Sequence, residues 1–421
     1  MSTRKRAGAR LRGAHTLQLL QDGGEYFDSL IEAIDQSRRE IRLETYIFRF
    51  DVVGLRVAAA LESAALRGVR TYISIDGFGT PAIPPEWEQR FRASGVSWRI
   101  FLPFGRIGLF LPVRWRRLHR KLCVLDGAVA YCGGFNVLDD FFDPNHGPLK
   151  EPRLDFAVRV TGPLVDDVLR VMTRFWWRQT AAADVRDKDL PAAWRDFEAS
   201  LQAGPAQPIR DNGMPSHASD QASGDGASGP QAYAELVLRD NLRNRRKIER
   251  AYLKAIGVAR HEVIISNAYF LPGARLRRAL VHASRRGVRV RLLLQGRYEY
   301  FLQYHATRAL YGKLLEAGVE IHEYTASFLH AKVAVIDSQW ATVGSSNLDP
   351  LSLLLAREAN LVMDDAGFAT RLHERLEAAI RQGSAMVDAR ILANRPWQQR
   401  ALEALASLAL RAGILVLGRR Y

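Results

Sequence analysis

A chain of 421 residues is long enough for two domains, each with its own hydrophobic core. The formal charge of +15 at neutral pH indicates an anionic partner, either nucleic acid or an anionic membrane surface. The two cysteines, Cys123 and Cys132, provide neither a disulfide framework nor a metal-ligand spacing. The composition therefore excludes a disulfide-stapled scaffold and favours a reducing compartment, with both thiols as small buried apolar groups.

The N-terminal residues 1–14 are basic, and we expect a mobile arm that either touches anionic headgroups or is simply solvated. No apolar stretch long enough for a signal peptide or a membrane span follows them. The alternating helical and strand patterns then predict a first lobe over residues 15–202. Its predicted helices are 26–34, 55–65 and 165–177, and its predicted strands are 41–48, 71–75 and 96–101.

An insertion before the first motif has an apolar run at 107–113 with arginines and Trp115 around it. Such a run could enter a lipid interface, or it could be an ordinary buried strand or loop. Residues 203–230 are rich in Gly, Pro, Ser and Asp, and we expect them to be a disordered linker.

The second lobe is predicted over residues 231–394 and repeats the order of the first. Its predicted helices are 248–256 and 276–284, and its predicted strands are 263–266, 290–294 and 319–322. The tail, 395–421, predicts an amphipathic helix with Trp397, Leu405 and Leu408 on one face. That face could lie in the headgroup plane of a membrane or dock onto the core.

Two segments carry the same polar residues at the same spacing, LHRKLCVLDGAVAYCGGFN at 118–136 and LHAKVAVIDSQWATVGSSN at 329–347. The offset is constant at 211 residues, since 330 minus 119 and 347 minus 136 give the same number. The paired positions are His119 and His330, Lys121 and Lys332, Asp126 and Asp337, Gly134 and Ser345, and Asn136 and Asn347. A constellation repeated in register indicates an internal duplication. We therefore predict an α/β fold of two sandwich lobes with mixed sheets and a site where the lobes meet.

This set of side chains suits phosphoryl transfer. Lysines and asparagines can hold the phosphate oxygens, one imidazole can attack phosphorus, and the other can serve as general acid and base. Each histidine needs a carboxylate on its far ring nitrogen, for which Asp155 and Glu358 are the candidates. Asp126 and Asp337 are included in the predicted catalytic set as organisers of the site, although both occupy turn positions. No metal ligand set is predicted.

The twin His-x-Lys-x4-Asp motif, with its glycine, serine and asparagine positions, resembles the phospholipase D superfamily. The segments GSSNLDPLSLLLAREAN, LETYIF and RDNLRNRRKIERAYLKAI resemble bacterial cardiolipin synthases of the type without N-terminal membrane spans. The resemblance implies phosphatidyl transfer between two phospholipids through a phosphohistidine, with phosphatidylglycerol or phosphatidylethanolamine as substrates. It also implies no cofactor, no nucleic-acid partner, and a peripheral position on the cytoplasmic face of the bacterial inner membrane.

Other functional classes remain open at this point. A phospholipase D-type hydrolase or a superfamily nuclease could use the same motifs, and a nuclease would also explain the basic charge. An inactive protein that binds anionic lipid or nucleic acid is disfavoured because both motifs are intact. The apolar insertion and the amphipathic tail favour a lipid substrate over nucleic acid.

Overall fold

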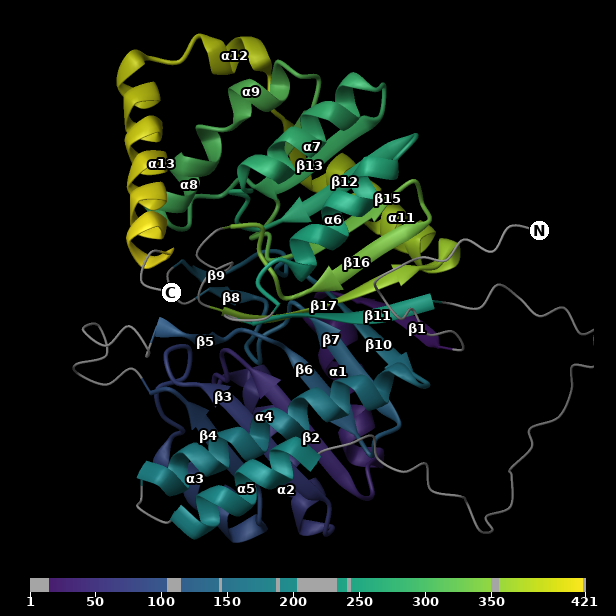
Figure 1. Cartoon of the computed structure of the whole chain (residues 1–421), viewed down its shortest axis with the longest axis vertical. Helices are drawn as coiled ribbons and strands as arrows, with labels where there is room; N and C mark the ends of the chain where they lie inside the picture. The colour runs from purple at the N-terminus through teal and green to yellow at the C-terminus, as the bar shows by residue number, and fades with distance from the viewer. Residues whose placement is uncertain are drawn as a thin grey trace, which may run out of the picture.

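The computed structural model describes residues 15–103, 115–143, 146–186, 190–202, 233–240, 244–349 and 356–418. Two lobes are stacked one above the other, the first in purple and blue and the second in green and yellow (Figure 1). The predicted arm at 1–14, the apolar run at 107–113 and the linker at 203–230 lie outside the described residues.

The first lobe has a mixed sheet. Its described strands lie in the order β1 (Thr16–Gln21), β10 (Phe156–Thr161), β7 (Val129–Gly133), β6 (Leu122–Leu125), β2 (Glu40–Thr45), β3 (Arg70–Asp76) and β4 (Ser97–Phe101). β2, β3 and β4 run parallel, and the other neighbours pair antiparallel. The helices of this lobe are α1 (Asp22–Gln36), α2 (Val52–Leu66), α3 (Pro85–Ser94), α4 (Leu164–Arg186) and α5 (Leu190–Gln202). A short ribbon, β8 (Phe142–Asp143) with β9 (Gly147–Pro148), stands apart from the sheet.

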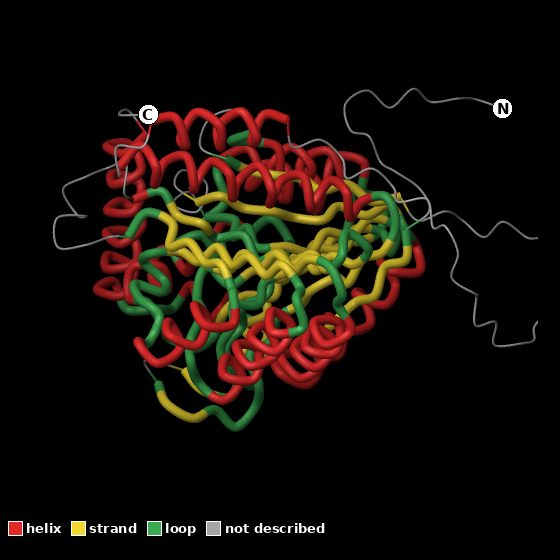
Figure 2. Tube along the Cα trace, turned by 90° about the horizontal axis from the view of Figure 1, so that it is seen from below, coloured by secondary structure: helices red, strands yellow, loops and turns green. Residues whose placement is uncertain are grey.

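The second lobe repeats this arrangement. Its strands lie in the order β11 (Tyr233–Arg239), β17 (Ala356–Asp364), β16 (Trp340–Gly344), β15 (Lys332–Ile336), β12 (Glu262–Asn267), β13 (Arg289–Gln295), β14 (Glu320–Tyr324) and β18 (Ser384–Met386). Its described helices are α6 (Lys247–Val258), α7 (Ala274–Arg285), α8 (Phe301–Arg308), α9 (Tyr311–Leu315), α11 (Ala366–Gly383), α12 (Ala389–Ala393) and α13 (Trp397–Gly418). The matching strand order confirms the predicted duplication and α/β class. In Figure 2 the strands form layers between the helices.

The motif strands are buried on both faces, as their uninterrupted apolar sequence requires. Leu122 and Val124 of β6 point into the core that contains α4, whereas Cys123 and Leu125 point to α1 and α2. This alternation follows the period of two along a strand. It also places the thiol of Cys123 in an apolar core, as predicted.

Each lobe has an apolar core of its own, as expected, and a third core is shared between the lobes. One apolar cluster contains Val124 and Val158 of the first lobe together with Val333, Val343 and Leu361 of the second. In addition, β5 (Arg117–Leu118) of the first lobe pairs in parallel with β17 of the second. The lobes share a core because the inner faces of their sheets are apolar as well as the outer ones, so the position of one lobe is fixed against the other.

The C-terminal helix α13 packs against α8 at the side of the second lobe (Figure 1). Ala406 and Ser407 are buried, whereas Trp397, Leu405 and Leu408 are exposed. The predicted apolar face is thus the one that faces solvent, and a second face makes the contact with the lobe. Within the described part of the chain, no helix has the length and apolar character that crossing a membrane requires.

Candidate active site

The segment that carries each histidine is held by the backbone of the other lobe. The backbone N–H of His119 donates to the carbonyl of Arg357 at 3.0 Å, and that of His330 donates to the carbonyl of Leu154 at 2.9 Å. His119 lies between β5 (Arg117–Leu118) and β6, and His330 lies just before β15, where the two lobes meet. The backbone around each histidine is therefore positioned only when the lobes are together.

A side chain at the end of a parallel strand fixes the preceding residue in each lobe. Asp76, which ends β3, accepts the N–H of Leu118 at 2.7 Å. Gln295, which ends β13, accepts the N–H of Leu329 at 3.1 Å. Neither residue was predicted from the motifs, although both follow repeated Gly-Val-Arg segments, at 68–70 and 287–289, and that repeat is the signal that identifies them.

The two histidine–carboxylate pairs are exchanged between the lobes. His119 Nδ1 lies 2.9 and 3.0 Å from the two carboxylate oxygens of Glu358, on β17 of the second lobe. His330 Nδ1 lies 2.6 Å from Oδ2 of Asp155, which precedes β10 of the first lobe. The structure thus brings together the predicted histidines and carboxylates. A carboxylate that accepts the Nδ1 proton leaves Nε2 as the basic nitrogen for the cavity.

Both motif lysines are buried beside the histidines. Nζ of Lys121 donates to the carbonyl of His119 at 2.8 Å, and Nζ of Lys332 donates to the carbonyl of His330. Burial lowers the pKa of Lys332 and lowers that of Lys121 well below its usual range, while Glu358 and Asp155 oppose these shifts. Desolvated cations of this kind interact strongly with an anion that enters the cavity.

Burial also lowers the pKa of the histidines. It lowers the pKa of His330 to about 3, an effect that Lys332 increases and Asp155 opposes. It lowers the pKa of His119 too, with Glu358 opposing the shift and Lys121 adding to it. Without a bound substrate anion, both imidazoles are neutral at pH 7. A neutral imidazole is the form that can attack phosphorus.

The small residues of the two motifs are not interchangeable. A Cβ atom at Gly134 would lie 2.1 Å from Oδ1 of Asp155, so only glycine leaves room for this carboxylate. At the equivalent position, the hydroxyl of Ser345 donates to Oε2 of Glu358 at 2.5 Å.

Asn136 and Asn347 line the cavity, and Oδ1 of Asn136 accepts the backbone N–H of Ile47. The side-chain amide of Asn136 therefore keeps its NH₂ group as a donor for a ligand.

The placement of Asp126 and Asp337 in the catalytic set needs correction. Asp126 has a φ of 53° in the β6–β7 turn, and its carboxylate accepts backbone N–H groups of residues 38–40. Asp337 has a φ of 51° in the β15–β16 turn and accepts those of residues 260–262. Neither lines the cavity. Each aspartate joins its hairpin turn to the start of the adjacent strand, so its role is in the fold.

We expect Asp337→Ala to lower the melting temperature while the folded protein keeps its activity, because three backbone donors lose their acceptor. The expected destabilisation is about 1–3 kcal/mol. Burial alone would raise the pKa of Asp337, but the backbone bonds from Glu262, Arg260 and His261 lower it overall. A depressed folded-state pKa gives stability that is present above the unfolded value near pH ~4 and is lost as the pH falls through the folded value.

Thermal melts of wild type and Asp337→Ala from pH 7 down to pH 3 provide the test. The difference in melting temperature should shrink towards the acid end. A variant that melts like wild type but has lost its activity would return Asp337 to the catalytic set.

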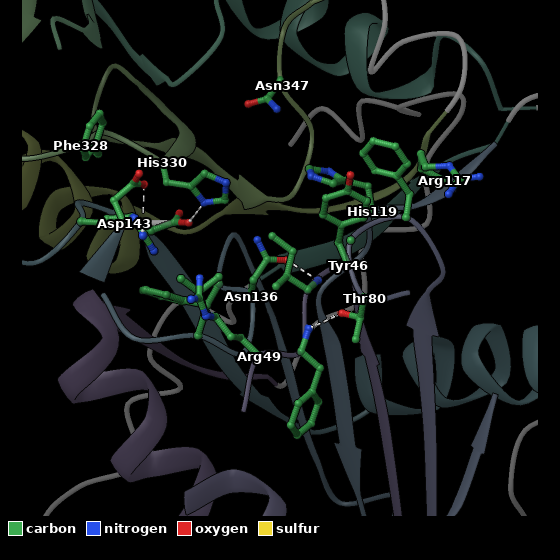
Figure 3. Close-up of a pocket in the computed structure, with 18 of the residues that line it drawn as sticks. Tyr46, Arg49, Thr80, Arg117, His119, Asn136, Asp143, Phe328, His330 and Asn347 are labelled. Carbon is green, nitrogen blue, oxygen red and sulfur yellow. Dashed lines mark hydrogen bonds and ion pairs between the residues drawn. The ribbon is translucent and has the colours of Figure 1, made fainter. Parts of the chain in front are cut away.

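The histidines open onto one large cavity between the lobes, with a volume of about 1150 Å³. His119 and His330 lie on opposite sides of it, with Asn136 below and Asn347 above (Figure 3). Residues from both lobes line the cavity that the sequence analysis did not identify: Tyr46, Arg49, Phe78, Arg117, Arg153, Tyr269, Glu299 and Tyr300. All except Arg117, which lies in the short strand β5, occupy loops, and none belongs to the repeated motif, so sequence spacing gave no signal for them.

One group of potential metal ligands lies away from the cavity. Among the described residues, Glu262, His373 and Glu377 bring ligand atoms within 4.8 Å of one another, a cluster that the sequence spacing did not reveal. The buried guanidinium of Arg291 lies 2.7 Å from Glu262 and also pairs with Glu377. A cation of the protein thus already neutralises both carboxylates, and we interpret the cluster as an ion-pair network.

Comparisons with known proteins identify the family of the chain. A family profile described as "Cardiolipin synthase, PLD-like domain" matches residues 30–147 and 252–380, one match in each lobe. The chain is 37% identical over 409 residues to cardiolipin synthase B of Escherichia coli strain K12, covering 95% of this chain and 89% of that protein. It is 30% identical over 395 residues to cardiolipin synthase A of Cronobacter sakazakii, covering 92% and 74%.

The crystal structure of phosphatidylserine synthase from Haemophilus influenzae Rd KW20 matches 97% of both chains with a TM-score of 0.66 at 12% identity, which shows a shared fold. The duplicated sheets, the exchanged dyads and the matches over both lobes lead to one assignment. The chain belongs to the cardiolipin synthase family of the phospholipase D superfamily, and it is an enzyme of the phosphatidyltransferase class.

Proposed function

We propose that this enzyme joins two molecules of phosphatidylglycerol into cardiolipin and releases glycerol. The observation that carries the proposal is the pair of histidine–carboxylate dyads whose imidazoles line one cavity, with a motif lysine bonded to the backbone of each histidine. Two imidazoles on opposite sides of one phosphate can divide the roles of nucleophile and proton carrier. The volume of about 1150 Å³ can hold the headgroups of two phospholipids.

In the first step, Nε2 of His119 attacks the phosphorus of one phosphatidylglycerol. A P–N bond forms, the P–O bond to glycerol breaks, and His330 gives a proton to the leaving oxygen. The pKa of His330 is low without a ligand, and a bound phosphodiester anion raises it towards the range that this acid role needs. The cations of Lys121 and Lys332 and the amide of Asn136 stabilise the charge that develops on the phosphate oxygens.

In the second step, a headgroup hydroxyl of another phosphatidylglycerol replaces the glycerol. His330, now neutral, removes its proton, the oxygen attacks phosphorus, and the P–N bond to His119 breaks. Cardiolipin leaves and both histidines return to their starting state. Water in place of the second lipid would yield phosphatidic acid, which is the competing hydrolase reaction.

The direct test is an assay of the purified enzyme with vesicles of labelled phosphatidylglycerol. Equal amounts of cardiolipin and glycerol should appear. Phosphatidic acid as the sole lipid product would identify a hydrolase. Cardiolipin formed only when phosphatidylethanolamine is added would identify a different donor or acceptor.

We further propose that the enzyme works as a peripheral protein on an anionic membrane surface, with α13 as one contact. Trp397, Leu405 and Leu408 are 73%, 63% and 63% exposed, on the face of α13 that does not pack against the lobe. Apolar side chains on such a face can enter the headgroup region. The basic charge of the chain supplies a second, salt-sensitive attraction.

Replacing Leu405 and Leu408 by serine should therefore weaken vesicle binding about tenfold, and more clearly at high salt than at low salt. Sedimentation with anionic vesicles at two salt concentrations measures this. Leu66→Ser is the matched control, because Leu66 is equally exposed at 70% but lies on the first lobe. Unchanged binding of the double variant at both salt concentrations would show that the membrane contact lies elsewhere.

A further inference from the structure

Several carboxylates that line the cavity have no part in the histidine dyads, and Glu299 is one of them. Glu299 lies in the loop between β13 and α8 and lines the cavity. Its Oε2 accepts a hydrogen bond from the hydroxyl of Tyr269 at 2.9 Å. Two other lining carboxylates have charged or ionisable partners, because Asp155 is bonded to the imidazole of His330 and Asp143 to the guanidinium of Arg153. The partner of Glu299 is instead the neutral hydroxyl of Tyr269, and both residues line the cavity.

The surroundings of Glu299 restrict which ligand group it can take. Burial raises the pKa of Glu299, as does nearby Asp143, whereas Arg153 lowers it, and Glu299 in turn raises the pKa of Lys332. A carboxylate beside a phosphate site repels the substrate unless the substrate offers it a hydrogen-bond donor. An ammonium donor would meet the repulsion of Lys332 and Arg153. A hydroxyl donor carries no charge and avoids that repulsion.

The duplication provides an internal comparison. Gly77 and Gly296 are equivalent, because each follows its parallel strand and donates its N–H to the end of the next strand at 2.8 and 2.9 Å. Three residues further on, the first lobe has Thr80 and the second has Glu299. The hydroxyl of Thr80 accepts the backbone N–H of Phe48 at 2.7 Å and so serves the fold. At this position, therefore, the loop of the second lobe presents the carboxylate of Glu299 to the cavity, whereas the loop of the first lobe has Thr80.

We infer that Glu299 and Tyr269 form a binding subsite for a hydroxyl group of the glycerol headgroup, on the His330 side of the cavity. This inference rests on the proposed function. A glycerol headgroup has vicinal hydroxyls: while one exchanges its proton with His330, its neighbour donates to the carboxylate of Glu299. The leaving glycerol and the headgroup of the incoming lipid are the same chemical group, so one subsite serves both steps.

The subsite also divides the roles of the histidines. The alcohol that leaves and the alcohol that enters both lie against the second lobe, next to His330. The nucleophile must approach phosphorus from the opposite side, where His119 stands (Figure 3). Glu299 is thus a specificity-determining residue. It gives the two nearly symmetric motifs different roles, because the equivalent loop of the first lobe has a threonine instead.

Competition between two soluble alcohols tests the subsite. Vesicles of phosphatidylglycerol are incubated with the full-length enzyme, labelled glycerol and 1-propanol, which has no second hydroxyl. The ratio of labelled phosphatidylglycerol to phosphatidylpropanol is measured. For Glu299→Gln this ratio should fall about tenfold, because a hydrogen bond to a charged acceptor is lost. Tyr269→Phe should lower the ratio in the same direction by less. Glu316→Gln, an exposed glutamate beyond α9, should leave the ratio as in wild type.

The outcomes separate the subsite from the proposed function. An unchanged ratio in Glu299→Gln, with both products still formed, overturns the subsite and leaves phosphatidyl transfer standing. Loss of all products in Glu299→Gln together with a wild-type ratio in Tyr269→Phe also overturns it. If ethanolamine, offered as a third acceptor, loses more than glycerol does in Glu299→Gln, the group recognised is an ammonium and the inference is wrong. A wild-type enzyme that transfers to neither lipid nor alcohol overturns the proposed function itself.

Discussion

Replacing either His119 or His330 by alanine should reduce cardiolipin formation by a factor of about 10³ or more, because each imidazole performs a different part of one cycle. The melting temperature should change little, since both imidazoles lie at the wall of the cavity. The assay with labelled phosphatidylglycerol measures the loss. Turnover near the wild-type rate in either variant would contradict the mechanism. His282→Ala, an exposed histidine on α7, is the matched control.

A substrate with a good leaving group should distinguish the two roles. A p-nitrophenyl phosphodiester needs no general acid to expel its nitrophenolate. We therefore expect His330→Ala to release a burst of nitrophenolate equal to the amount of enzyme and to stop with a phosphorus adduct on His119, because the base for the second step is missing. His119→Ala should give no burst. Mass spectrometry at alkaline pH locates the acid-labile adduct, and an adduct on His330 in the His119→Ala variant would exchange the roles.

The sequence predicts the elements around the site because their signals are local. The short apolar runs LCVL and VAVI, which follow His-x-Lys, identify the motif strands, and the Asp-Gly pair at 126–127 identifies the hairpin turn. The distance of Asp126 from the chemistry could also have been derived. A strand rises about 3.3 Å per residue, so an aspartate five residues beyond Lys121 lies roughly 16 Å along the strand, out of reach of a phosphate.

The exchange of the carboxylates could not be predicted in the same way. Asp155 and Glu358 follow their own motifs in the sequence, so chain order alone would pair Asp155 with His119. The pairing is decided by β5 against β17 and by the shared core, which are contacts between residues about 200 positions apart. Glu299 could not be predicted for another reason. Its loop has no periodic pattern, and its equivalent in the first lobe is a threonine.

These exchanged pairs lead to a second large effect. Asp155→Asn and Glu358→Gln should each lower kcat by about 10²–10⁴, with a smaller change in KM. An amide cannot hold the imidazole with its proton on Nδ1 as a carboxylate does, so Nε2 is no longer presented as the basic nitrogen. Both carboxylates are almost fully buried, at 1% and 0% exposed, so water cannot replace them. Ser345→Ala, which removes the hydroxyl that bonds Glu358, should have a smaller effect in the same direction.

The pH dependence of kcat distinguishes positioning from mere structural damage. Asp155 raises the pKa of His330, so Asp155→Asn lowers that pKa, and the acid form of His330 is lost at a lower pH. The alkaline limb of the profile should therefore move to lower pH. Glu358 raises the pKa of His119, so Glu358→Gln keeps the nucleophile neutral to a lower pH and should move the acid limb instead. If Asp155→Asn moves the acid limb and Glu358→Gln the alkaline limb, the roles of the two histidines are the reverse of those proposed. If neither limb moves while kcat falls, both carboxylates only stabilise the interface between the lobes.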